Sequence, residues 1–140
     1  MNIKSLLISF VVVFILVSAT DFLIHGVWLS SLYGATNELW RPEEEMTSGA
    51  YMGWLHAGHA LAALAFTTLW AAGFAGKAKL TCGIKYGLFM ALFSQSYTLI
   101  TYAVQPMPLE LIWKWMISGI LQGMLLGAVV SLVYKPKPAA

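Results

Sequence analysis

The chain has 140 residues, of which 59% are hydrophobic and only 10% are charged, and its mean hydropathy is +0.75. Because a soluble domain carries about 25% charged residues, this composition excludes an ordinary soluble enzyme and predicts an integral membrane protein. The single cysteine, Cys82, excludes an internal disulfide and a CxxC redox pair. The sequence has no HExxH pattern, glycine-rich phosphate loop or nucleophile motif, so it does not predict an enzyme, and nothing in it indicates nucleic-acid binding.

The first apolar stretch covers residues 6–32 and predicts a membrane-spanning helix. Lys4, the apolar run that follows it and the Val-Ser-Ala triplet at 17–19 resemble a signal peptide with a small-residue cleavage site. The apolar run continues past this triplet through Trp28. We therefore expect a first span that is retained and not cleaved.

Two ionisable residues, Asp21 and His25, lie inside this first span. Such a side chain costs roughly 2.5–3.5 kcal/mol in a bilayer, so it usually faces protein, a cavity or a ligand. A separation of four residues brings both side chains to one face of an α-helix. The other two histidines, His56 and His59, are three residues apart in the next apolar stretch. All three histidines of the protein are therefore expected in or near the membrane.

Three further apolar stretches follow the first, at residues 50–74, 84–104 and 109–134. Each reaches the roughly 20 residues that cross the hydrocarbon core, and each is apolar on all sides, which favours helices over a barrel. The loop at 34–49 is the only sizeable segment between them. The predicted fold is thus an all-α integral membrane protein, a four-transmembrane-helix bundle that forms a single membrane domain over 1–140.

The last span carries two consecutive GxxxG steps, formed by Gly119, Gly123 and Gly127. Small residues at this spacing let helix backbones approach closely, either within the chain, in a homo-oligomer or in a larger membrane complex. Similar short motifs, Gly-Trp-Leu at 53–55 and Lys-Trp-Met at 114–116, suggest that the bundle consists of two repeated helical hairpins.

The distribution of charge predicts the orientation. Lysines occur at the N-terminus, in the second loop and at the C-terminus, where there is no acidic residue: Lys4, Lys77, Lys79, Lys85, Lys135 and Lys137. The carboxylates other than Asp21 lie in the first and third loops: Glu38, Glu43, Glu44, Glu45 and Glu110. Since positive residues stay on the cytoplasmic side, we expect both termini in the cytoplasm of a bacterial cell with the chain in its inner membrane.

The depth of each polar residue follows from a rise of about 1.5 Å per residue, counted from the midpoint of its span. Asp21 is then level with His59 and His25 with His56, all in the outer half of the bilayer. Consecutive spans joined by a short loop are usually neighbours. The third and fourth spans add polar residues at similar depths: Gln95, Tyr97, Thr101, Ser118 and Gln122.

Four hypotheses account for this cluster. Imidazoles and a carboxylate suit Zn²⁺ or Cu²⁺, with Asp21, His25, His56 and His59 as metal ligands. His25 together with His56 or His59 could instead hold a haem between two helices, or one histidine could ligate a pigment. Asp and His within spans also form proton relays in transporters. In the fourth hypothesis the cluster is structural, and Asp21 simply pairs with His59 or His25.

The leading interpretation is a small inner-membrane protein that binds a metal ion or small ligand through this Asp/His cluster near the periplasmic face. The second hairpin lacks ionisable groups at these depths, so the site is expected on the first two spans. One alternative is an accessory or structural subunit of a larger membrane complex, which the glycine face of the last span would contact. The other is a small transporter or proton relay.

Overall fold

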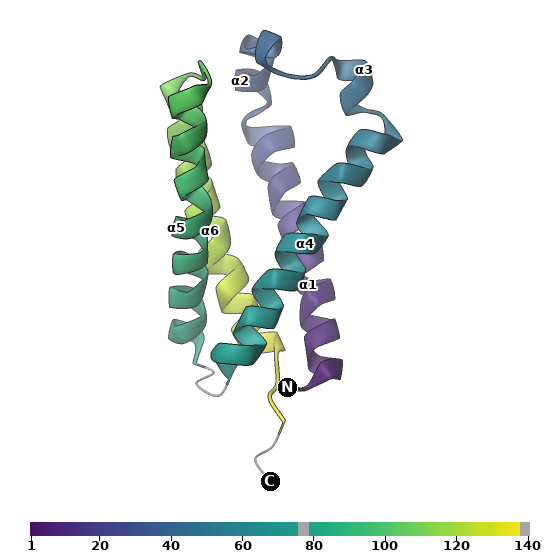
Figure 1. Ribbon diagram of the computed structural model, residues 1–140, viewed down its shortest axis with the longest axis vertical. Helices are drawn as coiled ribbons and strands as arrows, with labels where there is room; N and C mark the ends of the chain where they lie inside the picture. Colours follow the sequence, from purple (N-terminus) through teal and green to yellow (C-terminus); the bar gives the residue numbers. More distant parts are fainter. Residues whose placement is uncertain (76–78, 138–140) are drawn as a thin grey trace.

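The computed structural model describes residues 1–75 and 79–137 (Figure 1). The regular elements of these residues are all helical, as the sequence predicts. In chain order they are α1 (Ile3–Asp21), the π-helix η1 (Phe22–Trp28), α2 (Ser30–Ala35), the 3₁₀ helix η2 (Asn37–Leu39), α3 (Glu43–Met46), α4 (Gly49–Gly73), α5 (Leu80–Val104) and α6 (Leu109–Val133). Lys77, one of the lysines used to predict the orientation, lies outside the described residues.

Three segments of the described chain are long and apolar enough to cross a membrane: Ile3–Trp28, Leu80–Val104 and Leu109–Val133. The protein therefore has the composition and helix lengths of a membrane protein. Helix α4 has 25 residues but is not among these segments. His56 and His59 lower its mean hydropathy, since imidazole is strongly polar.

Most helix ends lie close to the predicted ones. Helix α4 matches the expected span 50–74 to within one residue and α6 matches 109–134 equally well, whereas α5 begins at Leu80 instead of residue 84. The Ser48 hydroxyl accepts a hydrogen bond from the Tyr51 backbone N–H and so caps the start of α4.

The first predicted span, 6–32, is not one continuous α-helix. After Asp21 the backbone widens into η1, and the Leu29 N–H donates to the Ile24 carbonyl, which closes a five-residue turn. Gly26 lies within η1 and is a poor helix former, which favours such a local change. The chain then turns at Leu29, so α2 is a separate short helix at the end of the bundle opposite the N-terminus (Figure 1).

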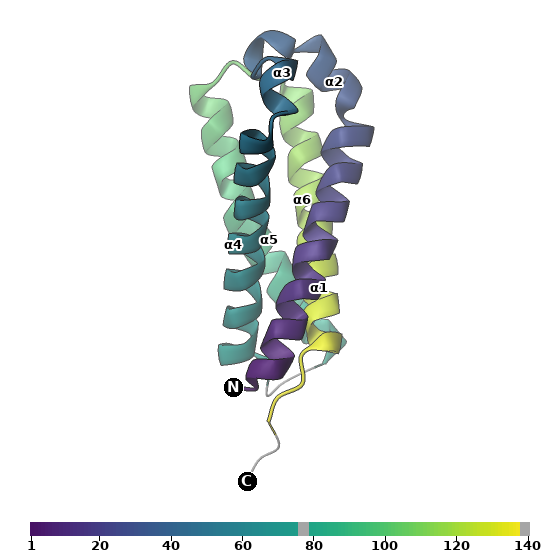
Figure 2. The same cartoon turned by 90° about the vertical axis from the view of Figure 1, so that its right-hand side faces the viewer.

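The four long helices pack unequally. Helix α1 packs against both α4 and α6, and α5 packs most extensively against α6 (Figures 1 and 2). Helices α1 and α4 cross near the middle of the molecule and diverge towards α2 and α3. As a result residues 52–58, two turns of α4, are exposed on all sides within this chain.

Glycines make the close contact between α5 and α6. A Cβ atom placed on Gly87 would collide with the Gly123 carbonyl oxygen, and one on Gly127 with the Gly83 carbonyl oxygen. A Cβ atom on Gly119 would collide with the Gln95 side chain. The glycine face of the last span thus packs inside the chain, which is the intramolecular alternative of the sequence analysis.

The apolar core lies at the end of the bundle that holds the start of α1 and the end of α6 (Figure 1). Trp70 is fully buried there against Tyr86. The Tyr86 hydroxyl donates a hydrogen bond of 2.5 Å to the Phe66 carbonyl oxygen. The Asn2 backbone N–H donates to the Tyr134 hydroxyl at 3.0 Å and ties the two ends of the chain together. This core holds the helices together at one end of the bundle. The polar side chains of Asp21, His25 and His59 lie in the middle of the bundle and towards its opposite end.

Candidate functional site

Asp21, the last residue of α1, is the centre of the candidate site. Its Oδ2 atom lies 2.7 Å from His59 Nε2 on α4, and its Oδ1 atom accepts a hydrogen bond of 2.6 Å from the Gln122 amide on α6. The His59 side chain is 10% exposed and that of Asp21 is 26% exposed. The carboxylate therefore joins three helices, and each of its oxygens has a protein partner.

The hydrogen bonds continue on both sides of Asp21. His59 Nδ1 lies 3.1 Å from the Ser18 hydroxyl, and the Gln122 amide also donates to the Thr20 hydroxyl at 2.7 Å. When a neutral His59 donates from Nε2 to the carboxylate, its Nδ1 accepts the Ser18 proton. Ser18, His59 and Asp21 are hydrogen-bonded in the same series as the Ser-His-Asp triad of hydrolases. Ser18, however, does not line the polar cavity described below.

His25 belongs to a second polar group beside the first. Its Nδ1 lies 2.5 Å from the Tyr33 hydroxyl, which accepts a hydrogen bond of 2.7 Å from the Trp115 indole N–H. Since indole can only donate, the Tyr33 hydroxyl is free to donate to His25 Nδ1, which leaves the imidazole proton on Nε2. Burial raises the pKa of Tyr33 to about 12, so this donor keeps its proton at neutral pH.

His56 is not part of either group. Its side chain is exposed on α4, and its ring lies 6.3 Å from the Phe14 ring and 6.1 Å from the His59 ring, measured between centroids. The depth argument correctly placed Asp21 level with His59. It also paired His25 with His56, and this pairing is absent because α4 leans away from η1 beyond the crossing point (Figure 1).

The predicted metal ligands are therefore only partly brought together. In residues 1–75 and 79–137 no group of three or more His, Cys, Asp or Glu side chains is arranged to hold a metal ion. Asp21 and His59 form one pair, and His25 has its own partners.

A cavity of about 230 Å³ opens beside Asp21, between η1, α5 and α6. Its polar lining comes from Asp21, His25, Gln95, Thr98, Ser118 and Gln122, and Trp115 adds one aromatic wall. Gln95, Ser118 and Gln122 were predicted at this depth, but the site itself was expected on the first two spans. In the structure α5 and α6 supply most of the cavity, because α1 packs on α6 as well as on α4.

Two of the polar residues expected at this depth lie elsewhere. Tyr97 is 60% exposed on the outer face of α5, and the Thr101 hydroxyl donates to the backbone carbonyl of its own helix. Conversely, sequence reasoning did not include Thr98 and Trp115 in the site. Helical spacing offers the signal for Thr98, which is three residues after Gln95 and donates to its Oε1 atom at 2.8 Å.

No family model, curated protein sequence or solved structure matches this chain. The described residues form an all-helical protein with three segments long and apolar enough to span a membrane and a polar, carboxylate-bearing cavity within the bundle.

Proposed function

We propose that this protein binds a small cationic ligand in the cavity beside Asp21. The observation that carries the proposal is a carboxylate that lines a polar cavity while lying inside an apolar segment long enough to span a membrane. In the described part of the chain, the ion pairs of Arg41 and Lys114 are with Glu45 and Glu110, away from Asp21. The partners of Asp21 are a neutral amide and a histidine, so its negative charge is not permanently neutralised.

The hydroxyl groups of the cavity also favour a cation. Ser118 donates its proton to the Lys114 carbonyl at 2.7 Å, and Thr98 donates to Gln95. Both hydroxyls therefore present lone pairs to the cavity, as a positively charged head group requires. A charge pair at Asp21 gains strength from the low dielectric of the bundle.

The proposal includes four spans with both termini in the cytoplasm of a bacterial cell. At about 1.5 Å per residue α4 is long enough to cross roughly 30 Å of hydrocarbon, and it packs along α1. The lysine-rich end of the bundle would then be cytoplasmic, and the cavity would lie towards the periplasm. Glu43, Glu44 and Glu45 on α3 would attract cations at that end.

Metal and haem binding stay predictions with less support. Zn²⁺ or Cu²⁺ could use Asp21 and His59, but a complete ligand set would require a third group such as His25 to move towards this pair. A haem held by His25 and either His56 or His59 would require the same change. The glycines proposed to contact an oligomeric or complex partner pack against α5, so a partner would have to use another surface, for example around Trp54, which is 81% exposed.

A proton relay is a second candidate, supported by the hydrogen bonds that link Ser18, His59 and Asp21. Asp–His pairs within spans transfer protons in transporters. Proton flux into proteoliposomes that depends on the Asp21 carboxylate would favour this function over simple binding.

Binding of radiolabelled tetramethylammonium to the purified protein tests the main proposal. We expect saturable binding that weakens by about tenfold or more in Asp21→Asn, because the amide keeps the size of the side chain and removes its charge. Glu38→Gln is the matched control, since this carboxylate is exposed on η2 and does not line the cavity. Equal binding by wild type and Asp21→Asn, or none by wild type, would contradict the proposal.

A further inference from the structure

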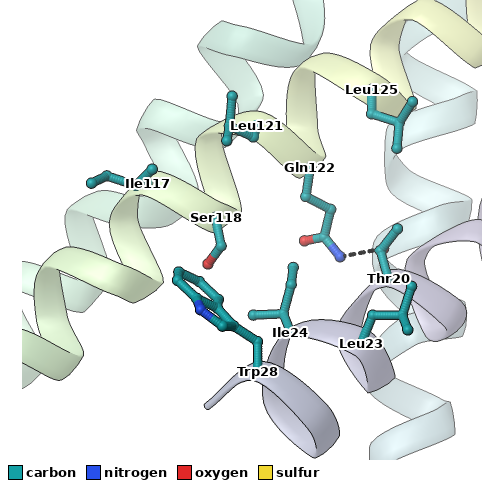
Figure 3. Close-up of a pocket in the computed structure, with 9 residues that line it drawn as sticks. All are labelled: Thr20, Leu23, Ile24, Trp28, Ile117, Ser118, Leu121, Gln122 and Leu125. Carbon is teal, nitrogen blue, oxygen red and sulfur yellow. Dashed lines mark hydrogen bonds between the residues drawn. The ribbon is translucent and has the colours of Figure 1, made fainter.

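A second cavity lies next to the polar one, between α1 and η1 on one side and α6 on the other (Figure 3). It is a groove of about 360 Å³, within the range of roughly 300–1,000 Å³ that ligand pockets occupy. Its walls are mainly apolar and are formed by Leu23, Ile24, Trp28, Ile117, Leu121 and Leu125. Leu121 is 62% exposed, so the groove is open along its side to the surroundings of the bundle.

The groove and the polar cavity adjoin each other. Ile24, Ser118 and Gln122 line both of them. Figure 3 shows Ser118 and Gln122 reaching from α6 into the space between the helices, with Gln122 bonded to Thr20. The same Gln122 amide donates to Asp21, so the carboxylate lies directly behind the polar end of the groove.

Charge complementarity indicates what this combined space would hold. One end presents the Asp21 carboxylate and hydroxyl lone pairs, and the other presents only apolar side chains and the Trp28 indole. Lys114 approaches one wall of the groove, with its Nζ 5.8 Å from the centroid of the Trp28 ring. Its charge is balanced by Glu110 at 2.7 Å, so it does not oppose a cation at Asp21.

We propose that the groove and the cavity form one site for a lipophilic cation. The positive head lies beside Asp21, and the apolar part lies along the groove between η1 and α6, so that the ligand enters sideways from the bilayer. This inference rests on the proposed cation site and adds the class of its ligand. Indole rings at both ends, Trp28 in the groove and Trp115 in the cavity, also suit a cationic ligand with an apolar body.

Displacement of radiolabelled tetramethylammonium from protein in nanodiscs tests the inference. The two competitors are unlabelled tetramethylammonium, which has no tail, and octyltrimethylammonium, which has the same head with an apolar tail. At equal free aqueous concentration, we expect the tailed cation to bind about tenfold more tightly or better, because burial of a few methylene groups suffices for that.

Two tryptophan variants locate the tail. Leu121→Trp fills the groove and should abolish the advantage of the tailed cation while the tailless one still binds, which also shows that the variant is folded. Leu132→Trp is the matched control, because Leu132 is similarly exposed on α6 but lies outside the groove, and it should keep the advantage.

The outcomes separate the two proposals. Equal affinities for both cations in wild type, or a tail advantage that Leu121→Trp leaves intact, would overturn the lipophilic-cation site and leave the cation site at Asp21 standing. The groove would then hold ordinary lipid chains. Absence of any Asp21-dependent binding, of either cation, would overturn the proposed function and this inference with it.

Discussion

The chemistry of the site depends on how one carboxylate is accommodated inside an apolar helix. Asp21 has donors on two neighbouring helices, His59 Nε2 at 2.7 Å and the Gln122 amide at 2.6 Å. A buried carboxylate that loses such a partner keeps its desolvation penalty, so each donor matters more than the net strength of its hydrogen bond suggests. This explains why a protein with so few charged residues places polar groups on three helices around a single acid.

The two histidines of α4 should therefore differ in their effect on stability. His59→Ala removes a partner of Asp21 and also leaves Ser18 without its acceptor, so we expect the free energy of unfolding to fall by about 1–3 kcal/mol. His56→Ala is the matched control: the same change three residues away, at an exposed side chain, should alter it by less than about 0.5 kcal/mol. Thermal unfolding in detergent measures both, and equal losses would contradict the assignment of His59 as the structural partner.

At the scale of elements, the closest packing is between α5 and α6. Glycines from both helices allow the backbones to touch, and the polar cavity lies at the end of the same pair away from the apolar core, where Gly119 approaches Gln95. The π-helical turn of η1 forms the other side of the cavity. It ends the regular α1 helix directly after Asp21 and precedes the turn that leads to Tyr33. Rigid packing on one side and an irregular turn on the other together form the walls of the cavity.

This packing predicts opposite effects for two glycine substitutions. Gly87→Ala places a methyl group against the Gly123 carbonyl oxygen, so we expect a loss of about 1–3 kcal/mol in the free energy of unfolding. Gly58→Ala, in the interior of α4 with nothing within 4 Å of the new Cβ atom, should be neutral or stabilising by up to about 1 kcal/mol. Unfolding in a detergent series measures the difference, and a neutral Gly87→Ala variant would show that the helices are not in this contact.

At the scale of the whole molecule, the two ends of the bundle differ both in charge and in how closely the helices pack. The N-terminus, the start of α5 and the end of α6 lie at one end of the bundle, and the acidic α3 lies at the other (Figure 1). At the basic end the apolar core packs the helices together. Towards the acidic end α4 diverges from the other helices, so the helices are closely packed at one end of the bundle and spread apart at the other.

Cysteine labelling tests the proposed orientation. Cys82, near the start of α5, should resist a membrane-impermeant maleimide in intact cells and react after permeabilisation, because the basic end is expected in the cytoplasm. A Thr47→Cys substitution in a Cys82→Ala background marks the other end, just after α3, and should react in intact cells. The reverse pattern would invert the orientation, and labelling of both in intact cells would contradict a structure that spans the membrane between them.

The sequence by itself determined the class of the fold, the approximate ends of α4 and α6 and the equal depth of Asp21 and His59. These are local properties, set by composition, by the length of apolar runs and by the constant rise of a helix. Only the tertiary structure decided that Gln122 holds the second oxygen of Asp21, that the α6 glycines face α5 and that His56 is left exposed. The tilt and rotation of each helix follow from its packing against neighbours, which no single stretch of sequence encodes. The site was expected on the first two spans, whereas in the structure it is a cavity that α5 and α6 largely line.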